Sequence, residues 1–268
     1  MTNAVIGIAR QELVQLLRHP ASIILALVLI TLVCIGVAGV YNMTYGQLTM
    51  SIGYQANDPV YLGAIETIGL ISGIFLIMSA FLGAMSIPYD RWNHSYNVLL
   101  GKPVRRRDII LGKFAGLSGF MLLLNAFVFV VSATLSVAFI GEPNSQSEYW
   151  LWVCGLIAMF TLTCSAIIAL NLLIGTISKN FLVVASLSFV YITIELFWYK
   201  DWFLRSLSWL TPINLNPGGD VFGDGMFFLS NLGSVPVPNS LVHLAVLLIE
   251  LAGFLLAGVY LFTREDIT

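Results

Sequence analysis

Charged residues are scarce in this sequence. They make up 10% of its 268 residues, whereas a soluble domain carries roughly 25%. Hydrophobic residues make up 58%, and the mean hydropathy is +0.91. This balance excludes an ordinary water-soluble domain and favours a chain built for a membrane.

Cysteine and recognisable catalytic motifs are scarce too. The three cysteines, Cys34, Cys154 and Cys164, all lie inside apolar runs without a C-x-x-C spacing, which signals neither a disulfide framework nor a metal site. The motifs H-E-x-x-H, G-x-G-x-x-G and G-x-x-x-x-G-K-[ST] are absent, so the sequence offers no metalloprotease or nucleotide-binding signature. We expect no catalytic residue, metal or cofactor on this chain. Without a long linker or low-complexity tract, residues 1–268 are predicted to form a single membrane domain.

Long apolar runs dominate what is present. A membrane-spanning helix needs about 20 mostly apolar residues. Six stretches meet this requirement: residues 21–40, 63–87, 113–141, 150–178, 181–199 and 241–263. The sequence therefore predicts an all-α membrane protein with six transmembrane helices.

The first 20 residues have a different pattern. On a helical wheel, five apolar residues share one face: Ile6, Ala9, Leu13, Leu16 and Leu17. Polar residues lie opposite them: Gln11, Gln15 and Arg18. This pattern predicts an elbow helix in the membrane interface over residues 1–20, ended by Pro20.

The basic residues indicate the orientation. Six spans place both termini on one side, and ten of the twelve basic residues then share that side: Arg10, Arg18, Arg91, Lys102, Arg105, Arg106, Arg107, Lys113, Lys179 and Arg264. Only Lys200 and Arg205 fall on the other side. By the positive-inside rule, both termini are predicted to be cytoplasmic in a multi-pass protein of the cell membrane.

Five of these cations gather in one short stretch, "GKPVRRRDIILGK" at residues 101–113. A simple charge anchor between the second and third spans would account for them. The surrounding segment, residues 88–112, is however too long and too apolar for an anchor alone. We therefore predict short coupling helices there, packed under the membrane and presenting a surface to a partner.

The stretch "P-V-R-R-R-D-I-I-L-G-K", together with the N-terminal helix and the ending "YLFTREDI" at residues 260–267, resembles the permease subunits of type-2 ABC exporters. The small six-span kind without a large outer domain is the most similar in size. The family usually has a Gly-Thr pair leading into this loop, whereas residues 90–100 read "DRWNHSYNVLL".

The resemblance implies that a separate ATPase drives transport. The expected partners are two copies of an ABC ATPase that bind ATP and Mg, a second permease (itself or a homologue), and membrane lipid, but no nucleic acid. Nine residues are predicted to dock the ATPase: Asn97, Val98, Leu99, Leu100, Arg105, Arg106, Arg107, Asp108 and Lys113.

Several polar residues interrupt the predicted spans. Charged groups in a bilayer are costly and often functional, so four residues are candidates for lining a pathway: Glu66, Glu195, Glu250 and His243. Interhelical hydrogen bonding or contact with the interface is the structural alternative for these carboxylates. Asn125 and Asn171 are interpreted as amides that bridge helices.

Residues 200–240 are neither a polar loop nor a full span. They fit a gate-like re-entrant or interfacial segment on the outer side, and equally an interfacial cap without a gating role. Two other functions stay open at this point: an ATP-independent, ion-coupled carrier or channel, and a structural membrane anchor of a cytoplasmic complex.

Overall fold

The computed structural model describes residues 2–45, 59–92, 105–178, 180–197 and 237–264. Within these ranges it consists of helices and contains no strand, which confirms the all-α class. The helices are α1 (Thr2–Arg18), α2 (Pro20–Tyr45), α3 (Pro59–Trp92), α5 (Arg106–Ile140), α6 (Gln146–Ile177), α7 (Phe181–Phe197) and α10 (Val237–Arg264).

A helix occupies each of the six predicted spans. Among the described residues, four segments are long and apolar enough to cross a membrane: Pro20–Gly39, Arg106–Ile140, Gln146–Ile177 and Leu247–Arg264. Two shorter apolar segments are Gly73–Pro88 in α3 and Phe181–Tyr191 in α7. The structure thus supports several membrane spans, and the count of six stays a prediction.

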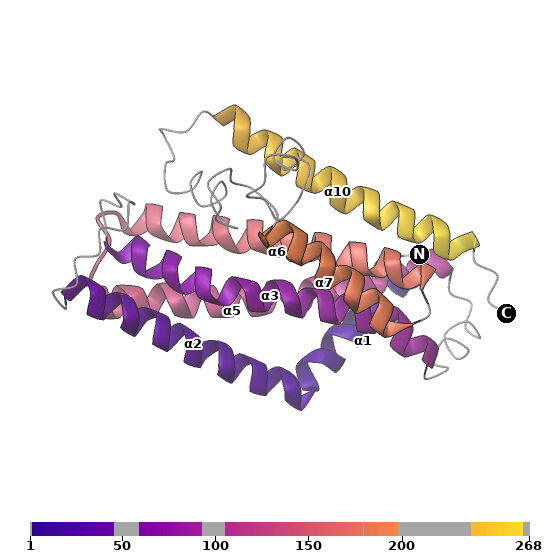
Figure 1. The fold of residues 1–268 in the computed structure, drawn as a ribbon, viewed down its shortest axis with the longest axis horizontal. Helices are drawn as coiled ribbons and strands as arrows, with labels where there is room; N and C mark the ends of the chain where they lie inside the picture. Colours follow the sequence, from indigo (N-terminus) through magenta and orange to yellow (C-terminus); the bar gives the residue numbers. More distant parts are fainter. Residues whose placement is uncertain (1, 46–58, 93–104, 179, 198–236, 265–268) are drawn as a thin grey trace.

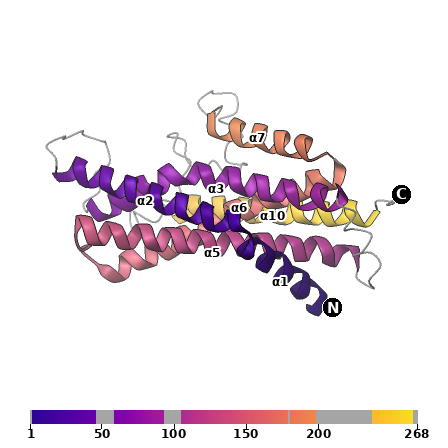
Figure 2. The same cartoon turned by 90° about the horizontal axis from the view of Figure 1, so that it is seen from below.

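The helices form an elongated bundle (Figure 1). Helices α3, α5 and α6 pack against one another at its centre. Around them, α2 packs on α3 and α5, α7 packs mainly on α3, and α10 packs mainly on α6. Figure 2 shows α1 leaving the axis of the bundle and crossing α5, the helix with which it makes its main contact.

Two short connections show why α5 ends and α7 begins where they do. Gly141 follows α5 with a φ of 133°, a conformation that favours glycine, and its N–H donates to the carbonyl of Val137 at 3.2 Å. Between α6 and α7, Asn180 Oδ1 accepts from the N–H of Leu182 at 2.9 Å, as an N-cap does. The short connection predicted at residues 178–180 is confirmed.

Both ends of the predicted coupling segment, residues 88–112, are helical. Helix α3 runs through Pro88 to Trp92, and α5 begins at Arg106. Ile109 and Ile110 are fully buried, so these apolar side chains serve the core of the chain itself. Residues 93–104 lie outside the described residues, as does the predicted outer segment except for residues 237–240, which belong to α10.

Helix α1 ends at Arg18 and α2 starts at Pro20, so the predicted break at the proline is confirmed. The predicted apolar face of α1 is divided between two surroundings. Ile6 and Leu17 are 62% and 46% exposed, whereas Leu13 and Leu16 of that face pack against the core, as does Ile8. The placement of α1 in the membrane interface stays a prediction.

Candidate functional site

Three consecutive arginines stand at the start of α5. Arg105 precedes the helix with extended backbone angles, φ −71° and ψ 138°, and its carbonyl accepts from the N–H of Asp108 at 2.9 Å. Arg105 and Arg107 are exposed and Arg106 is half-buried. The N-terminus of a helix already carries a partial positive charge. Three guanidinium groups therefore add to a field of their own sign. Asp108 lies 3.6 Å from Arg107 and offsets part of this charge.

We name Arg105–Arg107 the arginine surface. Two other predicted docking residues, Asp108 and Lys113, lie on the same helix but are buried within the chain. Asn97, Val98, Leu99 and Leu100 lie outside the described residues. The docking assignment of all nine residues stays a prediction. Among the docking residues that the structure describes, the exposed charges belong to the arginine surface.

Lys113 has an acidic partner in α1. Its Nζ lies 2.5 Å from Glu12 Oε1, although 101 residues separate the two in sequence. The Lys113 side chain is 3% exposed and that of Glu12 is 22% exposed. Because an unpaired buried charge is costly, this pairing explains how a lysine is tolerated inside the bundle. Sequence reasoning missed Glu12, and the signal available was a lone carboxylate in an otherwise amphipathic helix.

Two glycines let α1 approach α5 on either side of Lys113. A Cβ atom at Gly112 would lie 2.7 Å from Ile8 Cβ and 3.1 Å from the carbonyl oxygen of Val5. Gly116, one turn further along α5, lies equally close to α1. The two helices therefore touch through their backbones, in the manner of small-residue contacts between membrane helices. We name Glu12, Gly112, Lys113 and Gly116 the α1–α5 clamp.

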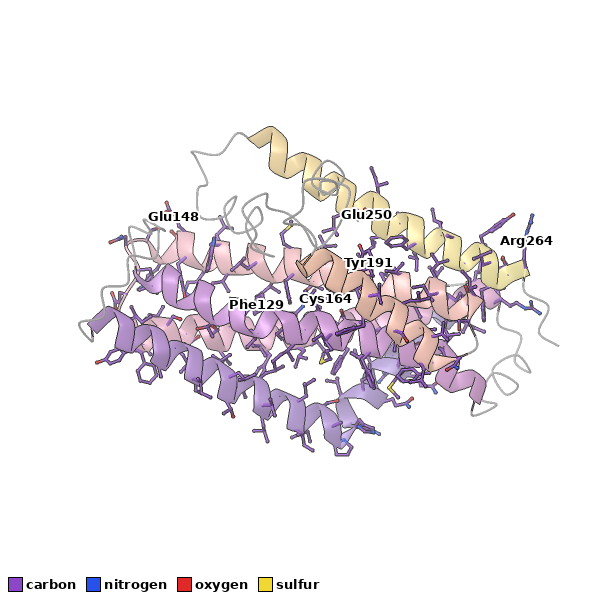
Figure 3. The ribbon with its side chains drawn as sticks, viewed as in Figure 1. Phe129, Glu148, Cys164, Tyr191, Glu250 and Arg264 are labelled. Atoms are coloured by element: carbon purple, nitrogen blue, oxygen red, sulfur yellow. The ribbon has the colours of Figure 1, made fainter. Side chains whose placement is uncertain are left out.

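The centre of the bundle is closed by aromatic rings. Phe75 of α3, Phe129 of α5 and Phe160 of α6 meet with ring centroids 5.4 to 6.1 Å apart. Figure 3 shows Phe129 and Cys164 near the middle of the long axis. The interior of one chain is thus filled at this level by packed side chains.

A buried polar layer lies one helical turn from the rings, at Ser79, Asn125 and Cys164. Asn125 Nδ2 donates to Thr161 Oγ1 at 3.2 Å and so joins α5 to α6. In the same way, Ser188 of α7 donates to Oδ1 of Asn171 in α6. The interpretation of both asparagines as bridges between helices is confirmed.

The four candidate pathway residues are distributed over three helices. Glu66 lies in α3, Glu195 in α7, and His243 and Glu250 in α10. Glu250 is half-buried, and the side chains of the other three lie outside the described part of the structure. Among the described residues, no group of three or more His, Cys, Asp or Glu side chains could hold a metal ion.

Large apolar side chains are exposed on the outer helices. They include Ile23, Ile24 and Leu27 on α2, Leu182 and Phe189 on α7, and Ile249 and Leu256 on α10. Exposed apolar surface of this extent is expected where a helix faces lipid or another membrane subunit.

One comparison with known proteins gives a match. A family model described as "ABC-2 family transporter protein" matches residues 59–237, which is more than half of the chain. The matched region runs from the start of α3 to the start of α10 and so contains the arginine surface and Lys113, but not Glu12. The comparison with curated proteins gave no match.

Proposed function

This chain belongs to the ABC-2 family of transporter proteins, and on that basis we propose that it is the membrane subunit of an ATP-driven exporter. It is a type-2 ABC permease, a membrane protein of a family that associates with an ABC ATPase. In our proposal, ATP and Mg bind to that separate ATPase, and this chain contributes the docking surface and the path for the substrate.

The arginine surface carries the proposal. Arg105 and Arg107 are exposed and Arg106 is half-buried at the start of α5, where the positive end of the helix adds to their charge. A basic surface of this kind attracts an acidic groove on a partner protein. Asn97, Val98, Leu99 and Leu100 are proposed to dock the ATPase as well, and the buried Ile109 and Ile110 anchor the start of α5 in the core.

We place the end of the bundle that carries the arginine surface and Arg264 in the cytoplasm. Arg264, in the last turn of α10, lies at the opposite end of the long axis from Glu148, in the first turn of α6 (Figure 3). The excess of basic residues at the Arg264 end supports this orientation. Both termini are then cytoplasmic, where the ATPase and its ATP are found.

We place the substrate path between two copies of the permease, identical or homologous, each with its own ATPase subunit. Aromatic packing fills the centre of one chain, whereas apolar side chains are exposed on α2, α7 and α10. Glu66, Glu195, Glu250 and His243 are proposed to line the outer part of this path.

Affinity purification from native membranes tests the proposal. The wild-type chain is expected to retain an ATP-binding protein with vanadate-sensitive ATPase activity. The triple variant Arg105→Glu, Arg106→Glu, Arg107→Glu is expected to retain at least tenfold less, a loss of about 1.4 kcal/mol or more. Raising the salt concentration should weaken retention by the wild type, because exposed charges are screened.

Arg264→Glu is the matched control, because it reverses an exposed arginine at the same end of the bundle. It should retain the ATPase like the wild type. A wild-type chain that captures no ATPase, or that transports without ATP, would contradict the proposal and favour an ATP-independent carrier.

A further inference from the structure

We propose that Glu12 and Lys113 are positioning residues that make α1 and the base of α5 one rigid body. A push received at the arginine surface then passes through α1 to α2. This inference rests on the proposed function, since the ATPase supplies the push.

The Glu12–Lys113 pair lies close to the arginine surface. Lys113 lies six residues after Arg107 on a continuous helix, which is about 9 Å at the α-helical rise of about 1.5 Å per residue. A force on the arginine surface therefore reaches Lys113 through one unbroken helix. Glu12, at 2.5 Å from the lysine, is the point at which that force leaves α5.

The backbones of α1 and α5 lie close together around this pair. Gly112 faces Ile8 and Gly116 faces Ala9 and Glu12, so one turn of α1 lies directly against one turn of α5. Contacts between backbones transmit displacement with less slack than contacts between long side chains. The charged pair fixes the register, because sliding α1 by one residue would move Glu12 away from the buried ammonium.

Stability alone does not account for a buried ion pair at this position. Replacing a buried ion pair by apolar residues of similar volume is often neutral or stabilising. The neighbouring residues at this contact, Ile8 and Ala9, are already apolar. A buried charge pair here is better accounted for by the unique register that it imposes on α1.

The final link is covalent. Helix α1 ends at Arg18 and α2 begins at Pro20, so only His19 separates the two. The Ser22 N–H donates to the His19 carbonyl at 3.0 Å, and the His19 N–H donates to the Gln15 carbonyl at 3.1 Å. This tight bend passes a displacement of α1 directly to the start of α2.

Two spin-label distances test the inference in the complex with the co-purified ATPase, after replacement of the three native cysteines. The first joins Gln11→Cys in α1 to Ala115→Cys in α5, and the second joins Ile24→Cys in α2 to Leu256→Cys in α10. All four positions are exposed. Each distance is measured without nucleotide and after vanadate trapping.

In the otherwise wild-type complex, the α1–α5 distance should stay unchanged on trapping while the α2–α10 distance shifts. Glu12→Gln should broaden the α1–α5 distribution and at least halve the α2–α10 shift, with the ATPase still retained. Exchanging the charges, with Glu12→Lys and Lys113→Glu, should restore both. Glu148→Gln, at the opposite end of the bundle, is the control and should change neither distance.

Two results would overturn the inference: an α1–α5 distance that changes on trapping in the wild type, or a Glu12→Gln complex with both distances like the wild type. A purely structural role would lower the yield of Glu12→Gln but leave the α2–α10 shift of the surviving complexes intact. Loss of the ATPase from the wild type would refute the proposed function instead. The α1–α5 distance in the chain alone would still report whether the pair holds α1.

Discussion

Gly116 of α5 lies directly against Glu12 of α1, with room for a hydrogen atom but not for a methyl group. A Cβ atom at position 116 would lie 2.7 Å from the Cβ of Glu12 and 2.8 Å from the carbonyl oxygen of Ala9. The packing of α1 against α5 therefore requires a residue without a side chain at position 116.

Gly116→Ala should displace α1 from α5. Overpacking of this kind costs about 1–3 kcal/mol, which equals or exceeds the gain of about 1 kcal/mol from replacing a helical glycine by alanine. Gly119→Ala, on the same helix with nothing within 4 Å of its Cβ position, should keep that gain. Unfolding in detergent and proteolysis of α1 measure the two effects. A Gly116→Ala variant as stable as Gly119→Ala would show that the contact is looser than described.

Ser188→Ala should loosen α7. The serine hydroxyl shares its one proton between Oδ1 of Asn171 and the carbonyl of Val184. Hydrogen bonds between membrane helices contribute about 0.6 kcal/mol on average and about 1.7 at most. We expect a loss of stability within that range. Ser186→Ala removes only an exposed bond to the carbonyl of Leu182 in the same helix and should cost less. Equal losses in the two variants would rule out a contribution from the interhelical bond.

Phe129→Ala should be strongly destabilising. Its ring packs against Phe75 and Phe160 in the closed centre of the bundle, and removal of a buried phenylalanine costs about 3–5 kcal/mol. Phe127→Ala changes a ring on the same helix that is 48% exposed and should cost much less. Detergent-induced unfolding of the two variants measures the two losses of stability. If the centre were open, both substitutions would cause only a small loss.

The orientation predicts which residues are reachable from outside intact cells. A membrane-impermeant thiol reagent should label Glu148→Cys and leave Arg105→Cys unlabelled until the cells are opened. The two positions are exposed, and α5 and α6 start at opposite ends of the bundle (Figure 1). Labelling of Arg105→Cys in intact cells would reverse the proposed sides. Native Cys34 and Cys154 must be replaced first, because both are exposed.

Sequence reasoning located the helices well because the membrane requirement is simple. About 20 apolar residues are needed to span the hydrocarbon core, and six such runs stand between clear interruptions. The break at Pro20 and the connection at residues 178–180 followed from equally local rules. Both asparagine bridges could be predicted because a buried amide in a membrane has few alternatives to bonding a neighbouring helix.

Contacts between distant segments could not be predicted in the same way. Lys113 was assigned to the docking surface because it stood in a basic loop, and its pairing with Glu12 depends on how α1 crosses α5. The contact of Ile8 with the core depends on the same crossing and was not predicted. Gly112 and Gly116, a hundred residues later in the chain, decide which side of α1 is buried.

Site-specific photo-crosslinking tests the central claim most directly. A photoreactive amino acid at Arg106 in the native membrane should link this chain to an ABC ATPase, and the same group at Glu148 should not. Crosslinks to an ATPase from position 148, or none from position 106 while crosslinks to other proteins form there, would contradict docking at the arginine surface.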